Sequence, residues 1–517
     1  MNKSRYFQVS LCVSLMGLLL TACTPFQHVH DGQEQNPTSR LNPNKQVDAP
    51  FPGWVAGLPK IQAPKGFNWR QFAGTHLRFI SEITPPSSAL RANIKEFENV
   101  TGIDVTIEQM DLESVVEKVG LEFHAHADTH QVIYADPYQV LAEYSNQFVD
   151  LNRLNHDPAL PHIPGGVHDF ISTQLAVDGY MGSDQNLYTL PYDSPTMIMA
   201  YRKDIFDKYK SLFLREEGFD WTPGPNLTWE QYYTIAKWIN EKVKQGIITE
   251  VKYGTGEQAK QYDSLMCDFS NILAAYGGDY FHNPNMGYVG TFHPGPSALQ
   301  SQNAIRAATF YQKLMQVADP YSISWDWQDL ADAFAGGDLA MAPMWHEYSA
   351  MFENPKTSRV VGKVGWSLLP RGPVRSANIF GGTGIGINKY ATPNEQKAAW
   401  LFLIWATSPQ TEYEILQSKA GGETPTRHSV YNLEAVRKGM EPGTAESGLM
   451  PNLLPMKATL DAWKKQYLYT RPKIPNWTEI DTVIFTELEK MIANKETPAQ
   501  AMNRIAQKTN QVTGEHL

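Results

Sequence analysis

Between residues 76 and 135 short apolar runs alternate with segments of helical periodicity. Three apolar runs have the length and composition of strands: 76–80, 103–107 and 131–134. Apolar residues at helical spacing predict helices between them, over 89–100 and 115–123. This order of elements predicts a parallel α/β lobe. Ligands of such sheets bind at the carboxyl ends of the strands, where Glu82 and Asp136 lie.

A second set of elements follows from residue 187. The runs 187–193 and 197–201 predict two strands, both of which we assign to a second lobe. Thr228, followed by apolar residues at core spacing, predicts the start of a helix. Further helical patterns cover 265–276, 302–317, 328–335, 394–406, 410–419 and 480–493.

The first residues have the pattern of an export signal. A basic start with Lys3 and Arg5 precedes an apolar stretch over 11–20, which is too short to span a bilayer. Leu20-Thr-Ala-Cys23 ends this stretch and resembles the bacterial lipobox, which implies cleavage before Cys23 and lipidation of its thiol. Residues 24–70 are rich in Pro, Asn, Gln and Gly, so we expect a flexible tether.

Composition and charge narrow the class of protein. The chain has 517 residues, of which 42% are hydrophobic and 19% charged, so it is not a disordered chain. Its net charge of −10 argues against nucleic acid as a partner. It has three cysteines, which excludes a disulfide scaffold, and we expect Cys267 to be a buried, unreactive thiol.

Six local phrases, in this order along the chain, resemble the solute-binding proteins of ABC importers. The phrases are LPYD (190–193) with YRKDIF (201–206), TWEQY (228–232), FAGGDLAMAPMW (334–345), GGTGIGI (381–387), AAWLFLI (398–404) with TSPQ (407–410), and GGETPTR (421–427). The resemblance is strongest to the carbohydrate-binding group that includes the maltose and maltodextrin receptors. Many such receptors are lipoproteins, which agrees with the lipobox.

The resemblance implies an α/β fold of the periplasmic-binding-protein type, with two lobes, hinge strands and a central cleft. It implies a first lobe over 71–185 and 372–430 and a second lobe over 186–371 and 431–517, after the signal (1–23) and the tether (24–70).

A cleft that binds sugar needs flat aromatic rings for the C–H faces and charged groups for the hydroxyls. Trp345, Glu347 and Tyr348 fit this composition, and Trp325 and Trp327 fit it less well. We expect Trp345 to lie on the second lobe beside the hinge, with its ring exposed to the open cleft. By position, the resemblance implies further ligand contacts at Glu82, Asp136, Tyr138, Tyr192, Asp193, Gly382, Thr383 and Arg427. Asp193 could instead cap a turn, and Arg427 could instead clamp a helix end.

Enzyme motifs are absent from the sequence. It has no G-x-S-x-G elbow, no P-loop and no C-x-x-C, and His346-Glu347 lacks the second histidine of a zincin. His124, His126 and His130 form a histidine-rich cluster that we expect to lie at the surface without a metal. Glycoside hydrolysis would need two facing carboxylates, which Asp136, Asp193 and Glu347 could supply.

The sequence therefore favours a lipid-anchored, extracytoplasmic receptor that captures a carbohydrate and delivers it to the permease subunits of an ABC transporter. We expect a monomer with no catalytic residue, cofactor or metal. Two alternatives remain: a lipoprotein that senses sugar without transporting it, and a glycan-processing hydrolase.

Overall fold

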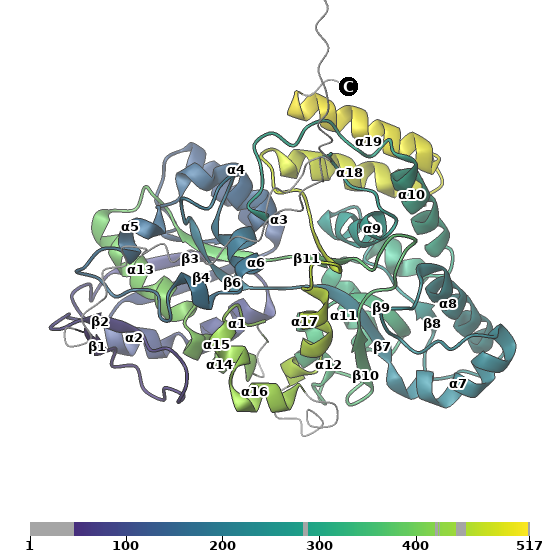
Figure 1. Cartoon of the computed structure of the whole chain (residues 1–517), viewed down its shortest axis with the longest axis horizontal. Helices are drawn as coiled ribbons and strands as arrows, with labels where there is room; N and C mark the ends of the chain where they lie inside the picture. Colours follow the sequence, from purple (N-terminus) through teal and green to yellow (C-terminus); the bar gives the residue numbers. More distant parts are fainter. Residues whose placement is uncertain (1–45, 283–287, 419–421, 423, 441–450, 515–517) are drawn as a thin grey trace, which may run out of the picture. The chain divides into compact units, whose positions relative to one another are not determined.

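The computed structural model describes residues 46–282, 288–418, 422, 424–440 and 451–514, which contain two larger β-sheets with their helices and two two-stranded sheets (Figure 1). Residues 46–517 belong to one compact unit. The export signal, Cys23 and the first part of the expected tether lie outside the described residues. Within the described part of the chain, no helix has both the length and the apolar character needed to cross a membrane.

The first lobe is built on a five-stranded sheet in the order β4-β3-β5-β12-β6. Its strands are β3 (His76–Glu82), β4 (Asp104–Met110), β5 (Val132–Ala135), β6 (Thr189–Asp193) and β12 (Thr383–Ile387). β3 is parallel to β4 and β5, and β12 is antiparallel to both of its neighbours. The carboxyl ends of β3, β5 and β6 therefore meet at one edge of the sheet.

The helices of the first lobe are α1 (Pro85–Asn93), α2 (Lys95–Thr101), α3 (Leu112–His124), α4 (Ala142–Tyr144), α5 (Leu151–Asn155), α6 (Ser172–Gln174), α13 (Pro393–Ala406) and α14 (Pro409–Leu416). α13 is apolar nearly all round because it lies inside the lobe. Its Phe402 ring packs edge to face on Phe79 of β3 and Phe97 of α2, with centroids 5.9 and 5.5 Å apart. The lobe thus combines segments from both ends of the chain around one core.

The second lobe contains a four-stranded sheet in the order β10-β7-β9-β8. The strands are β7 (Met197–Arg202), β8 (Tyr253–Thr255), β9 (Leu339–Trp345) and β10 (Val364–Ser367). The helices of this lobe are α7 (Lys203–Glu217), α8 (Trp229–Lys244), α9 (Asp263–Ala275), α10 (Gln302–Leu314), α11 (Trp327–Ala335), α12 (Ser349–Phe352), α18 (Trp477–Ile492) and α19 (Pro498–Thr513). Thr228 caps α8 in a capping box with Gln231, which confirms the predicted helix start.

The two sheets are joined by the hinge strand β11 (Asn378–Phe380), which lies between them in Figure 1. β11 pairs in parallel with β13 (Leu468–Thr470), and Phe380 also forms an isolated bridge with Thr196. The remaining elements of the C-terminal part are α15 (His428–Tyr431), α16 (Glu434–Gly439) and α17 (Met456–Ala462). The chain thus passes between the lobes at 194–196, near 378–382 and before β13.

The tether prediction is wrong for residues 46–70. β1 (Gln46–Asp48) and β2 (Gln62–Pro64) form a small antiparallel sheet, and Phe51 and Trp69 are buried in the core of the first lobe. Their rings pack edge to face with centroids 5.7 Å apart. Periodicity could not reveal this segment because its apolar residues are spaced irregularly and each is buried separately by tertiary contacts.

The strand Thr189–Asp193 was also assigned to the wrong lobe. It pairs with β12 in the five-stranded sheet, and the second lobe begins at β7. Its partner β12 lies far away along the chain, so local pattern carries no information on the pairing. This pairing brings Asp193 to the same sheet edge as Glu82 and Asp136.

Candidate ligand-binding cavity

A cavity of about 60 Å³ lies between the carboxyl edge of the five-stranded sheet and the second lobe. Eight of the expected site residues line it: Glu82, Asp136, Asp193, Trp345, Glu347, Tyr348, Gly382 and Thr383. The cavity is also lined by Leu112, Tyr134, Asp263 and Arg471, which were not among the residues expected from the sequence. Trp327, the weaker aromatic candidate, is a lining residue, whereas Trp325 is not.

Element ends position most of these side chains. Glu82 and Asp193 are the last residues of β3 and β6, and Asp136 directly follows β5. From the second lobe, Trp345 ends β9 and Trp327 begins α11. Strand ends point polar groups into a cleft without breaking the ladder, which is why α/β sheets bind ligands there.

Glu82 is held in place by a chain of two hydroxyl groups. Tyr134 donates its hydroxyl to Glu82 Oε2 at 2.9 Å, and Thr383 Oγ1 donates to Tyr134 at 2.9 Å. Burial raises the pKa of Glu82 to about 8, against the opposing effect of the Tyr134 hydrogen bond. Glu82 is therefore largely protonated at neutral pH and can donate as well as accept.

Asp193 and Glu347 form a carboxyl pair across the cavity, one from each lobe. Asp193 Oδ1 accepts the backbone N–H of Thr424 at 2.8 Å, and its carboxylate hydrogen-bonds to Glu347. Burial raises the pKa of Asp193 to about 6, against the opposing effect of its hydrogen bond with Glu347. Burial, and then the adjacent charge of Asp193, raise the pKa of Glu347 well above its usual value. The directions of the two shifts place the proton of this pair mainly on Glu347.

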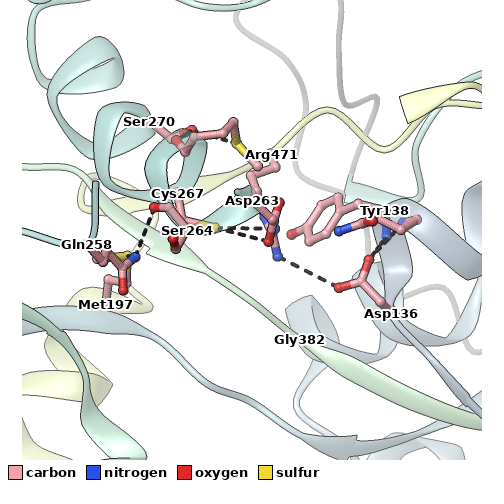
Figure 2. Close-up of polar contacts among 12 residues, drawn as sticks. Asp136, Tyr138, Met197, Gln258, Asp263, Ser264, Cys267, Ser270, Gly382 and Arg471 are labelled. Carbon is pink, nitrogen blue, oxygen red and sulfur yellow. Dashed lines mark hydrogen bonds and ion pairs between the residues drawn. The ribbon is translucent and has the colours of Figure 1, made fainter. Parts of the chain in front are cut away.

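Arg471 lies at the opposite side of the lining, between acids of both lobes (Figure 2). Its Nη1 lies 3.4 Å from Asp263 Oδ2, and its Nη2 lies 3.9 Å from Asp136 Oδ2. Asp136 Oδ1 also accepts the backbone N–H groups of Tyr138 and Gln139 at 2.9 and 2.7 Å. The guanidinium lies 4.2 Å from the centre of the Tyr138 ring. These contacts leave Asp136 as much a structural anchor as a ligand contact.

Three aromatic rings of the second lobe complete the walls. Trp327 is half-buried and packs against the hydrophobic clusters of both lobes. Trp345 lies on the second lobe beside the hinge, as expected, but it is only 7% exposed in this structure. Here Trp345 packs within the hydrophobic cluster of the second lobe, and its exposure in the open cleft stays a prediction.

Three expected ligand contacts lie away from the cavity. Tyr138 is buried and donates its hydroxyl to the carbonyl of Phe380 at 3.0 Å, so it braces the hinge. Tyr192 points to the other face of β6 from Asp193 and is buried in the core of the first lobe, edge to face with Phe79.

Arg427 clamps a helix end, the alternative that the sequence analysis had kept open. It is fully buried and donates to the carbonyl of Thr407, at the C-terminus of α13, and to that of Pro164.

Gly382 lines the cavity, but glycine is required there by contacts within the protein and not by a ligand. Its φ is +76°, a backbone conformation that favours glycine, and a Cβ would come within 2.2 Å of Asp178 Oδ1. The close approach is therefore to a buried carboxylate of the first lobe.

The histidine cluster only partly fits the prediction. His124 and His126 are exposed, as expected, but His130 is buried, with Nδ1 at 2.8 Å from Glu122 Oε2. Among the described residues, no group of three or more His, Cys, Asp or Glu side chains is placed to hold a metal ion. Cys267 is buried, as predicted, and lies 3.4 Å from Arg471 Nη1.

Residues 81–413 match the family model of the bacterial extracellular solute-binding proteins, and the chain belongs to this family. A relative from Sinorhizobium fredii, named as a probable amino-acid ABC transporter periplasmic-binding protein, is 21% identical over 86% of this chain and 89% of its own length.

Solved structures show the same fold. The maltose-bound MalE3 of T. maritima has a TM-score of 0.67 and 22% identity, over 85% of this chain and all of that one. A solute-binding protein from Agrobacterium radiobacter K84, in complex with ribitol, has a TM-score of 0.68 and 22% identity, over 85% and 99% of the two chains. The chain therefore has the two-lobed periplasmic-binding-protein fold.

Proposed function

We propose that this protein is a lipid-anchored, extracytoplasmic receptor that captures a carbohydrate or polyol and delivers it to the permease of an ABC transporter. The observation that carries this proposal is the cavity at the strand ends, where carboxyl groups and aromatic rings from both lobes converge in a member of the solute-binding family. The solved relatives that hold maltose and ribitol support a polyhydroxylated ligand. No catalytic step is part of the proposal.

The cavity residues fit hydroxyl groups as partners. Asp193 accepts hydrogen bonds, while a protonated Glu82 or Glu347 donates them, so both polarities of a hydroxyl can be paired. Trp327 and Trp345 offer ring faces for C–H groups. Because the contacts come from both lobes, ligand stabilises the closed arrangement, which is the form that we propose the permease reads.

The proposed lobe division follows the expected boundaries with two changes. We propose a first lobe over 71–185 and 372–430 and a second over 186–371 and 431–517, except that the segment 46–70 packs with the first lobe and Thr189–Asp193 joins its sheet. We propose a monomer, since the cavity is complete within one chain.

A thermal-shift screen over sugars and polyols tests the proposed ligand class. Ligand at 100 times its Kd should stabilise the protein by about 2.7 kcal/mol. Trp327→Ala, on the second lobe, and Asp193→Asn, on the first, should each reduce the shift given by a hit. If no compound of either class shifts the midpoint, the proposed ligand class is wrong. Stoichiometric release of a cleaved or altered sugar would favour the hydrolase alternative.

The anchor and the transport step are tested separately. Cys23→Ser should leave the protein unprocessed or release it from membranes. If the variant is cleaved at the same site and still partitions with membranes like the wild type, lipidation of Cys23 is contradicted. Stimulation of a reconstituted permease–ATPase by liganded protein would favour transport over sensing alone.

A further inference from the structure

Acidic groups greatly outnumber basic groups around the cavity. Five carboxyl groups line it, those of Glu82, Asp136, Asp193, Asp263 and Glu347, against one cationic side chain, Arg471. Two further buried acids, Asp178 and Asp481, interact electrostatically with this group, and so does one further base, Lys473. Neutral hydroxyl groups do not require such an excess.

The basic side chains are already engaged with one part of the acids. Arg471 forms ion pairs with Asp263 and Asp136 (Figure 2). It also interacts electrostatically with Asp481. Lys473 donates to the carbonyls of Val177 and Tyr180, and Asp178 is its nearest acidic influence. The positive charges of Arg471 and Lys473 therefore balance acids on the hinge side of the cavity.

The other three acids, Glu82, Asp193 and Glu347, lack a cationic partner. Within the described part of the chain, none of them makes an ion pair; Glu82 bonds to Tyr134, and Asp193 to the backbone of Thr424 and to Glu347. Arg471 acts on Glu82 only as a minor electrostatic influence. Glu347 Oε2 is enclosed and accepts no hydrogen bond from a donor of the described residues. We call Glu82, Asp193 and Glu347 the acidic trio.

Aromatic rings stand beside the acidic trio. Trp345 and Tyr348 flank Glu347 in sequence and line the same cavity, together with Trp327. Ring faces attract an organic cation, and a desolvated contact of this kind is stronger than an exposed one. Carboxylates and ring faces together make a better site for an ammonium group than for a hydroxyl.

We propose that the ligand is a polyhydroxylated compound that carries a protonated amine, an amino sugar or amino-polyol, with its ammonium group placed at the acidic trio. The inference rests on the proposed function, since it narrows the ligand of the same cavity. A metal ion is a poor alternative, because no described group of His, Cys, Asp or Glu is placed to hold one. An ammonium group would give three donors to acceptors that currently share protons.

Calorimetry with matched pairs tests the inference on the intact protein. D-Glucamine and D-glucitol differ only in an ammonium for a hydroxyl group, as do D-glucosamine and D-glucose; larger amino and neutral oligosaccharides extend the panel. We expect the amine of a pair to bind at least tenfold more tightly at pH 7. Glu347→Gln and Asp193→Asn should each reduce this ratio at least fivefold, because each removes a carboxyl group that can be ionised beside the ammonium and keeps its shape.

Asp338→Asn is the matched control, since Asp338 pairs with Lys252 on the surface of the second lobe, and it should leave the ratio unchanged. Equal or tighter binding of the neutral compound overturns the inference and leaves the proposed function standing. An amine preference that survives both trio variants also overturns it, because the ammonium would then lie elsewhere. If no compound of either series binds, the proposed function fails with it.

Discussion

The two sides of the cavity are both acidic, yet they differ in how their charge is balanced. On the hinge side, Asp136 and Asp263 hold Arg471 between the lobes. On the other side, Asp193 and Glu347 face each other with a shared proton. Both sides are built from the ends of strands and helices, so position alone does not separate them.

This difference in charge balance distinguishes acids with a structural role from acids that we propose bind ligand. A buried acid with a buried base is satisfied without ligand, and losing either partner leaves an uncompensated charge. A buried acid without a base has a raised pKa, and it ionises more easily once a ligand supplies hydrogen bonds or positive charge. We therefore assign the hinge side mainly to holding the lobes and the acidic trio mainly to binding.

The largest expected effect comes from removing the base on the balanced side. Arg471→Met should lower the free energy of unfolding by about 3–5 kcal/mol, because Asp136 and Asp263 lose their buried partner. Urea denaturation at pH 7 measures it. Lys252→Met, which removes the base of an exposed pair with Asp338, should cost less than about 1 kcal/mol. If both variants lost the same free energy of unfolding, the structural role of Arg471 would be contradicted.

Truncating the aromatic walls sharpens the same contrast. Trp345→Ala should cost about 3 kcal/mol of stability, at the low end for a buried Trp, as well as weakening ligand binding. Trp327→Ala, at a half-buried ring, should weaken binding with a smaller loss of stability. Calorimetry measures the affinity of both variants, and denaturation measures their stability. A larger loss of stability in Trp327→Ala than in Trp345→Ala would contradict this prediction.

The acidic trio should make stability depend on pH. The pKa of Glu82 rises from 4.5 to about 8 on folding, so the folded state holds a proton that the unfolded state releases. Its contribution is fully present below about pH 4.5 and is lost as pH rises toward 8, by an order of a few kcal/mol. Glu82→Gln cannot lose this proton, so its stability relative to wild type should increase between pH 5 and 8. A constant difference across that range, measured by urea denaturation, would show that Glu82 keeps an ordinary pKa.

The smallest expected effect is that of a chelator. If the acidic trio binds an organic cation, EDTA should change the free energy of unfolding by less than about 0.5 kcal/mol. Metal analysis of untagged protein should find no stoichiometric ion. The same holds for the cluster of His124, His126 and His130. A stoichiometric metal that Glu347→Gln abolishes would reassign the acidic trio, and one lost in His126→Ala would revive a hydrolase.

Much of the cavity was predictable because strand ends are visible in sequence. Glu82 and Asp136 follow apolar runs, and Trp345 ends the run that forms β9, so pattern and resemblance together placed them correctly. Asp263 and Arg471 were missed: each belongs to a segment whose partner lies roughly 200 residues away or more, and no local signal marks the pairing. Tyr138 was expected to contact ligand but lies against the hinge, because a residue beside a strand end can point either into the cleft or toward the hinge.

The sequence by itself determined the alternating α/β elements and caps such as Thr228, since these depend on local spacing and short-range hydrogen bonds. The class of protein followed from the resemblance of its motifs to a known family. Only the tertiary structure decided that Thr189–Asp193 pairs in the first lobe's sheet and that Phe51 and Trp69 are buried in its core. It also decided which acids form an ion pair with a base. The physical reason is that pairing and desolvation are set by residues distant in sequence. Whether a carboxyl group is an anchor or a ligand contact depends on the charge that folding brings beside it.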